Sequence, residues 1–340
     1  MVREKDFLVV AEIGVDDGPI GGIAADRDGH CVMVTNCSGD SVSVIDTRTR
    51  AVVSTISGTP EPFAIAIGAN DRACVSTSSA TCDAITVLDL RAGMVVAVHP
   101  VAFRVTDVAV SPNAAQVYCS ATAGGRAGVA ALDTTTGAGD FVTISAAPGT
   151  TADSVRASPD GRRLYAAAHG HSSDQLVLMD TRGLCVIGSI EIGSPIRDLA
   201  VSRNGDTVYV ASCSPDFGAV LDVIDACSGT IAGTAKITGA GRFVTQLALS
   251  ADGERAYLVG DQGVTVLCTR TLDVVGSVTV GGSPSCVVET AGGTSLCVAD
   301  HAGVVTVVSI PSISVGGDDD VTARNEWLLP DLLDLAPAMA

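Results

Sequence analysis

The residues Ser158-Pro159-Asp160-Gly161-Arg162-Arg163-Leu164-Tyr165-Ala166 form a turn that leads into an apolar run. All four tyrosines of the chain hold the position of Tyr165, and they lie 47, 44 and 48 residues apart: Tyr118, Tyr165, Tyr209 and Tyr257. Each one follows a Ser-x-Asp/Asn-x turn and precedes a Val/Ala/Ser-rich run. A fixed spacing of this size indicates an array of one supersecondary unit.

Each unit contains four strand-like segments. An Ile-Ala-Val-like strand a precedes the turn, strand b carries the tyrosine position, strand c ends in Asp in five of the units, and strand d is Val-rich. Strand a occurs seven times, near Gly22, Ala64, Asp107, Ser154, Asp198, Gln246 and Cys286. The pattern predicts an all-β, seven-bladed β-propeller with four-stranded blades.

The two ends of the repeat array are predicted to meet. The seventh copy stops after strand c at Ile310, whereas residues 7–14 have the pattern of strand d and precede the first strand a. We therefore expect residues 7–14 to pair with 304–310 and to complete one propeller domain over 7–310. Closing the ring removes two unpaired strand edges.

Aspartate ends strand c in five units: Asp46, Asp89, Asp133, Asp180 and Asp225. A carboxylate at this point can accept hydrogen bonds from the turn that leads into strand d. Because these aspartates occupy the same position in successive repeat units, we assign them an architectural role.

The repeat resembles the YVTN family of seven-bladed propellers over about residues 7–310. The signature Ser-Pro-Asp-Gly-x-x-x-Tyr-Val…Val-x-Val-Ile-Asp-x-x-Thr is best matched at 158–181 and 202–225. The resemblance implies the propeller fold. It does not single out one function, because the family includes surface-layer, binding and cofactor-associated proteins and relatives of propeller lactonases. Its signature residues are architectural, and no catalytic residue is carried over from them.

Composition restricts the kinds of partner. The chain has 340 residues and a net charge of −18, which disfavours nucleic acid and anionic membranes. Eleven cysteines occur without a Cys-x-x-Cys pair, as expected of reduced thiols in the cytoplasm. The chain shows neither a signal-peptide pattern nor an apolar run long enough to span a membrane. We expect a cytoplasmic protein and favour a monomer.

The positions just before the apolar run of each strand a are expected at the mouth of the central channel. In blades three to six these positions carry polar residues, which are candidate binding groups: Asp107, Asp153, Arg197, Asp198 and Gln246. The three aspartates come from consecutive blades and could hold Ca²⁺ or Mg²⁺. The alternative is a hydrated channel in which Arg156 and Arg197 balance the acids. No cofactor beyond this possible cation is predicted.

Two histidines share one loop between strands b and c. His169 and His171 point the same way if the loop is extended, which would allow metal ligation with Asp174. The alternative is that both are ordinary exposed loop residues. His301 lies in the equivalent loop of the last blade.

Residues 311–340 break the repeat. Gly316-Gly317-Asp318-Asp319-Asp320 has the composition of an acidic linker, and a leucine-rich tail follows. The candidate partner-binding residues of this tail are Trp327, Leu328, Leu329, Leu332 and Leu333. The alternative is that the tail folds back onto the propeller.

The sequence favours a non-catalytic binding or scaffold protein. A protein partner would bind the loop face around the channel, the tail, or both. The alternative is a lactonase-like, metal-dependent hydrolase with a divalent ion at the channel mouth, ligands Asp107, Asp153 and Asp198, and His169 or His301 as proton carrier. The chain contains no Gly-x-Ser-x-Gly nucleophile motif.

Overall fold

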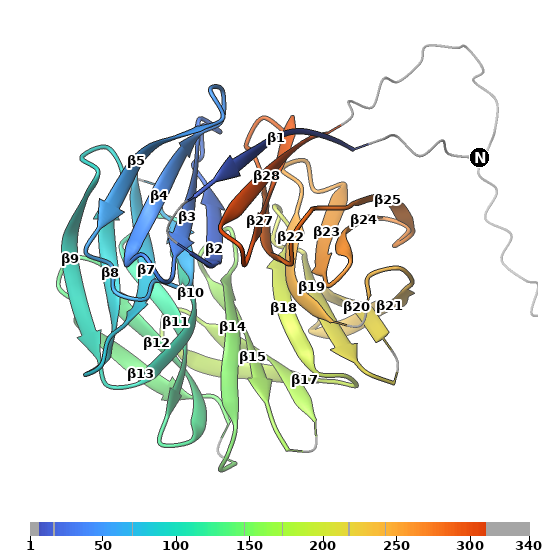
Figure 1. Cartoon of the computed structure of the whole chain (residues 1–340). Helices are drawn as coiled ribbons and strands as arrows, with labels where there is room; N and C mark the ends of the chain where they lie inside the picture. The colour runs from blue at the N-terminus through green and yellow to red at the C-terminus, as the bar shows by residue number, and fades with distance from the viewer. Residues whose placement is uncertain are drawn as a thin grey trace, which may run out of the picture.

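Seven four-stranded antiparallel sheets form a ring in the computed structural model (Figure 1). The structure describes residues 7–15, 18–69, 71–145, 147–171, 173–216, 218–241 and 243–310. Within these residues every regular element is a strand. The predicted all-β propeller with seven four-stranded blades is therefore confirmed.

Strand a of each blade faces the channel, and strands a to d follow chain order in blades 1 to 6, whereas strand d of blade 7 is the N-terminal strand β1. Blades 1 to 3 contain β2 (Ile20–Ala25), β3 (Cys31–Asn36), β4 (Ser41–Asp46) and β5 (Ala51–Ser57); β6 (Ile65–Ile67), β7 (Arg72–Ser78), β8 (Asp83–Asp89) and β9 (Met94–Val101); and β10 (Arg104–Val110), β11 (Gln116–Ala123), β12 (Arg126–Asp133) and β13 (Gly139–Thr143). Blades 4 and 5 contain β14 (Thr151–Ala157), β15 (Arg163–His169), β16 (Asp174–Asp180) and β17 (Cys185–Ile192); and β18 (Ile196–Val201), β19 (Thr207–Ser214), β20 (Gly218–Asp225) and β21 (Thr230–Ile237). Blades 6 and 7 contain β22 (Val244–Leu249), β23 (Arg255–Gly260), β24 (Gly263–Cys268) and β25 (Val274–Val278); and β26 (Pro284–Glu289), β27 (Ser295–Asp300), β28 (Val304–Ser309) and β1 (Leu8–Gly14).

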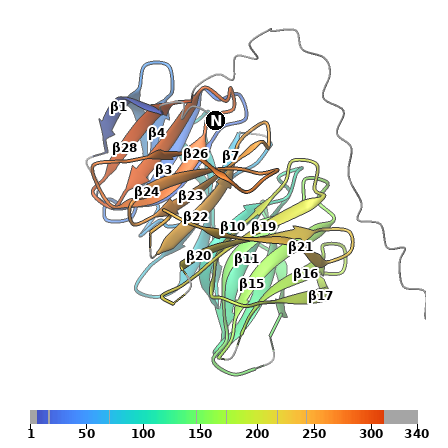
Figure 2. The same cartoon turned by 90° about the vertical axis from the view of Figure 1, so that its right-hand side faces the viewer.

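The N-terminal strand closes the ring. β1 pairs antiparallel with β28, from Leu8 opposite Ser309 to Gly14 opposite Val304. Figures 1 and 2 both show β1 beside β28, as the sequence predicts. The last blade is thus built from both ends of the array, and β28 has no unpaired edge.

The cores lie between neighbouring blades and consist mainly of Val, Ile, Leu and Ala. The repeat tyrosines belong to these cores: Tyr118, Tyr165 and Tyr257 are fully buried, and Tyr209 is nearly so. Tyr165 and Leu176 of blade 4, for example, pack in one cluster with Leu199 and Val208 of blade 5. Apolar faces on both sides of each sheet therefore hold the blades together.

The turns between strands c and d confirm the architectural role of the five aspartates. Oδ1 of Asp46 accepts hydrogen bonds from the N–H and hydroxyl of Thr49, and Asp133 accepts equivalent bonds from Thr136. Asp89, Asp180 and Asp225 also accept N–H groups of the turns that follow them. Gly161, in the turn between strands a and b of blade 4, has φ 70°, a conformation that favours glycine.

The tail prediction, with Trp327, Leu328, Leu329, Leu332 and Leu333, lies outside the described residues. Among the residues that the structure describes, no helix is long and apolar enough to cross a membrane.

Candidate functional site

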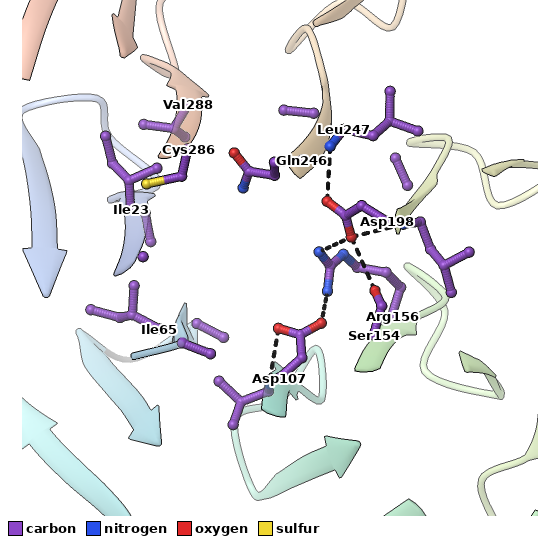
Figure 3. A pocket seen from close by; sticks show the side chains of 18 of the residues that line it. Ile23, Ile65, Asp107, Ser154, Arg156, Asp198, Gln246, Leu247, Cys286 and Val288 are labelled. Carbon is purple, nitrogen blue, oxygen red and sulfur yellow. Dashed lines mark hydrogen bonds and ion pairs between the residues drawn. The ribbon is translucent and has the colours of Figure 1, made fainter. Parts of the chain in front are cut away.

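The central channel contains a cavity of about 870 Å³, lined by strand a of all seven blades. Figure 3 shows its two unlike walls. Ile23 and Ile65 lie on one side, whereas Arg156, Asp107 and Asp198 lie on the other. The polar residues come from the blades that the sequence singled out.

A β-bulge places these polar side chains. The register shifts near the start of strand a in six blades, for example between Val105 and Asp107 and between Ile196 and Asp198. A bulge turns two consecutive side chains away from the regular alternation. The predicted channel-mouth residues all occupy these bulge positions: Asp107, Asp153, Arg197, Asp198 and Gln246.

The second residue of the bulge often connects one blade to the next. Asp107 accepts the N–H of Val155 at 3.0 Å. Asp198 accepts the N–H of Leu247 at 2.9 Å, and Gln246 Oε1 accepts that of Val287 at 2.5 Å. These side chains therefore stabilise the ring between blades 3 and 4 and from blade 5 to blade 7.

In blade 1 the equivalent position is Gly22. A Cβ atom there would lie 2.4 Å from the carbonyl oxygen of Phe63, so the close approach of blades 1 and 2 requires glycine. This contact explains why blade 1 has no polar side chain at this position.

Arg156 joins Asp107 and Asp198, which are both less exposed than Asp153, the third predicted acid of the channel mouth. Its guanidinium forms ion pairs with Asp107 and, at 2.7 Å, with Asp198 Oδ1, and it also donates to the carbonyl of Val155. Burial alone would lower the pKa of Arg156, but the charges of Asp107 and Asp198 raise it. Burial raises the pKa of Asp198, although Arg156 and the N–H groups of Leu199 and Leu247 favour its carboxylate form. The cluster spans blades 3 to 5 as one bonded unit (Figure 3).

His169 lies between two carboxylates at the rim of blade 4. Its Nδ1 is 2.6 Å from Oδ2 of Asp174, and its Nε2 is 3.4 Å from Oδ2 of Asp153. Burial would lower the pKa of His169, but the hydrogen bond to Asp174 and the charges of both acids raise it. The same Asp174 oxygen accepts the N–H of Ile196, so this cluster also anchors the link to blade 5.

The structure does not bring the five predicted metal ligands together. Asp107 and Asp198 surround Arg156, Asp153 lies beside His169, and His171 packs against Gly149. Within the described ranges no group of three or more His, Cys, Asp or Glu side chains could hold a metal ion. Arg197 and His301 line the cavity, and Arg197 forms no ion pair with any residue that the structure describes.

The structure contains a second depression, beside the channel, that the sequence did not predict. A groove of about 1160 Å³ lies over blades 1 to 3, between loops that join strands b to c and strands d to a. Its lining includes Phe63, Phe103 and Arg104, and Phe63 is 53% exposed. The sequence signal for this groove was that Phe63 and Phe103, two of only six phenylalanines, lie in consecutive links between blades.

Known proteins support the fold assignment. No protein-family model matches the chain, so the YVTN resemblance stays a prediction from the repeat signature. A seven-bladed β-propeller protein of Mycobacterium tuberculosis is 43% identical over 366 aligned positions, which cover 97% of this chain and 93% of the relative. A seven-bladed β-propeller protein of Mycolicibacterium smegmatis is 39% identical over 61 positions, covering 18% of this chain and 17% of the relative.

Two solved structures share the architecture at low sequence identity. Hydrazine synthase of Kuenenia stuttgartiensis superposes with a TM-score of 0.77 at 18% identity, covering 90% of this chain and 99% of that one. The Cps50 (Swd1) β-propeller domain of Myceliophteria thermophila gives 0.74 at 13% identity, covering 90% of this chain and 100% of that one. These two likenesses concern the fold alone. The close match to the M. tuberculosis protein over almost the whole length shows that the chain belongs to a family of seven-bladed β-propeller proteins.

Proposed function

We propose that this protein is a non-catalytic binding platform whose loop face holds a partner protein in the groove over blades 1 to 3. One observation carries the proposal: the groove exposes Phe63 beside Phe103 and Arg104. Aromatic and arginine side chains are enriched at the centres of protein interfaces, where they contribute much of the binding energy.

The charge of the groove indicates the chemistry of the partner. Asp40, Glu61 and Asp83 line it, against the single cation Arg104. Asp40 accepts the N–H of Glu61, and Asp83 accepts that of Val105, so these loops are internally braced. A partner segment with net positive charge and an apolar side chain for Phe63 complements this surface.

The alternative hydrolase gains no support from the channel. Asp107 and Asp198 are bonded to Arg156 and to backbone N–H groups of neighbouring blades. These contacts between neighbouring blades explain why the two acids lie where they do. The predicted tail contact stays a separate hypothesis, and deletion of residues 311–340 followed by the partner assay below tests it.

Paired substitutions test the groove. Glu61→Lys reverses a charge in the groove, and Glu191→Lys makes the same change on an exposed residue of β17. Phe63→Ser removes the aromatic ring, and Phe243→Ser removes a ring that is 59% exposed elsewhere on the molecule. Each variant is used for quantitative affinity enrichment from the cells that make the protein.

The proposal predicts a protein that is lost with Glu61→Lys and Phe63→Ser, retained with both controls, and released by raised salt. Equal loss in groove and control variants, or no protein that depends on either groove residue, would refute it. Melting temperatures that match wild type show that each variant is folded.

Exposed thiols favour a reducing compartment such as the cytoplasm. No disulfide joins any of the eleven cysteines, all of which lie within the described residues. Cys82, Cys185 and Cys227 are exposed, so an oxidising compartment would leave them open to disulfide exchange. Fractionation that recovers the protein outside the cytoplasm with oxidised thiols would contradict this placement.

A further inference from the structure

The channel cavity has the size of a small-molecule site. Its volume of about 870 Å³ lies within the ~300–1,000 Å³ of typical ligand pockets. It lies beside the groove proposed for the protein partner, because Phe63 and Thr106 line both spaces. The two sites are otherwise formed by different residues, so they can be tested separately.

One wall of the cavity is apolar. Blades 1 and 2 contribute Ile23, Ala25 and Ile65, and blade 7 adds Val288. Figure 3 shows Ile23, Ile65 and Val288 around one side of the space. No polar bulge side chain interrupts this wall in blade 1, where the position is Gly22. An apolar ligand body placed here would lose contact with water.

Hydrogen-bond donors without partners among the described residues lie on blades 5 to 7, opposite the apolar wall of the cavity. Gln246 accepts the N–H of Val287 through Oε1, which leaves its amide N–H groups without a partner in the described part of the chain. Figure 3 shows this side chain extending into the space. Arg197 of blade 5 and His301 of blade 7 lie on either side of it in blade order. Their side chains likewise have no hydrogen-bond or ion-pair partner among the residues described.

The acids of the channel form their ion pairs with Arg156 and His169, and none of those described is with Arg197. Arg156 lies between Asp107 and Asp198, and His169 lies between Asp153 and Asp174. Arg197 is therefore the unpaired cation of the channel mouth within the described residues. An arginine beside an apolar cavity attracts a carboxylate, and its planar guanidinium can donate two parallel hydrogen bonds to the two carboxylate oxygens.

We propose that the channel binds a small monocarboxylate with an apolar body. The carboxylate bonds to Arg197 and the amide of Gln246, and the apolar body lies against Ile23, Ile65 and Val288. The bonded unit of Arg156, Asp107 and Asp198 joins blades 3 to 5 in the wall of the same cavity. None of the residues proposed to contact the carboxylate or its apolar body lines the groove proposed for the protein partner.

Calorimetric titration of the full chain with octanoate tests the proposal, with octylammonium as the probe of opposite charge. Arg197→Met should weaken octanoate binding at least ~10-fold, the loss expected for one charge-assisted pair. Arg197→Lys should restore part of it. Arg126→Met is the matched control, because Arg126 is exposed and lines neither the cavity nor the groove.

Chain length tests the apolar wall. Wild type should bind octanoate more tightly than butanoate, and Ile65→Thr should reduce that preference while butanoate affinity changes little. Absence of saturable octanoate binding up to ~10 mM, a range that includes weak small-ligand affinities, would overturn the proposal. Equal binding of octylammonium, or equal losses in Arg197→Met and Arg126→Met, would overturn it as well. Partner capture by the groove variants is measured separately, so failure of one proposal leaves the other intact.

Discussion

Substitution of Arg156 by methionine should destabilise the propeller, because it leaves two acids without their shared cation. Methionine keeps the apolar stem and removes the guanidinium. The side chains of Asp107 and Asp198 are only 18% and 6% exposed, whereas that of Arg156 is 27% exposed. Removing one partner of a buried pair costs about 3–5 kcal/mol, and the partial exposure of Arg156 reduces this to about 2–4 kcal/mol. For a propeller of about 300 residues the melting temperature should fall by about 3–6 °C.

Differential scanning calorimetry at neutral pH measures this change. Arg197→Met is the matched control, because it removes a guanidinium from the same channel where no ion pair is lost; its melting temperature should stay within ~1 °C of wild type. In a double-mutant cycle, Asp198→Asn should cost less in the Arg156→Met background than in wild type. If Arg156→Met and Arg197→Met have equal effects, Arg156 does not stabilise the ring as described.

Three further predictions follow from the turns, the closing strand and the thiols. Hydrogen bonds from the turns that follow Asp46, Asp133 and Asp225 lower the pKa values of these carboxyl groups below the ordinary 3.8. The three carboxylates therefore stabilise the fold above pH 3.8, and this stabilisation is lost as the pH falls through the lowered pKa values. Melting curves should therefore show a decline below about pH 4, and Asp133→Asn should make that decline shallower; an unchanged slope would contradict the assignment. Deletion of residues 7–14 exposes the edge of β28 and should produce self-association on gel filtration, whereas a monodisperse product with wild-type melting temperature would contradict closure by β1. Thiol labelling of the native protein should modify Cys82, Cys185 and Cys227 rapidly but spare Cys74 and Cys297, because burial raises the pKa of these two thiols to about 12; equal labelling by mass spectrometry would show that the blades open readily.

The repeat made most of the fold predictable. Tyr165 and its counterparts, the Asp-Gly turns and the aspartates that end strand c occur in phase, so blade number, strand order and closure could all be inferred. The pairing of residues 7–14 with β28 was predictable because one strand was missing at the end of the array.

The partners of the polar residues could not be predicted from the repeat. It placed Asp107, Asp153 and Asp198 near the channel mouth, but three acids there could equally hold a cation or bond to the protein. In the structure the bulges direct Asp107 and Asp198 to Arg156 and to N–H groups of the next blade, contacts that no repeat pattern specifies. The groove depends on loops from three blades, whose packing no local pattern specifies.

Site-specific photo-crosslinking tests the binding-platform account most directly. A photoreactive phenylalanine analogue replaces Phe63 or, as the control, Phe243 in the cells that make the protein. The account predicts one discrete adduct from the Phe63 position, none from Phe243, and loss of the adduct when Glu61→Lys is added. The crosslinked segment should carry net positive charge and an apolar side chain. Equal adducts at both positions, no adduct at Phe63, or an acidic segment in the adduct would contradict it.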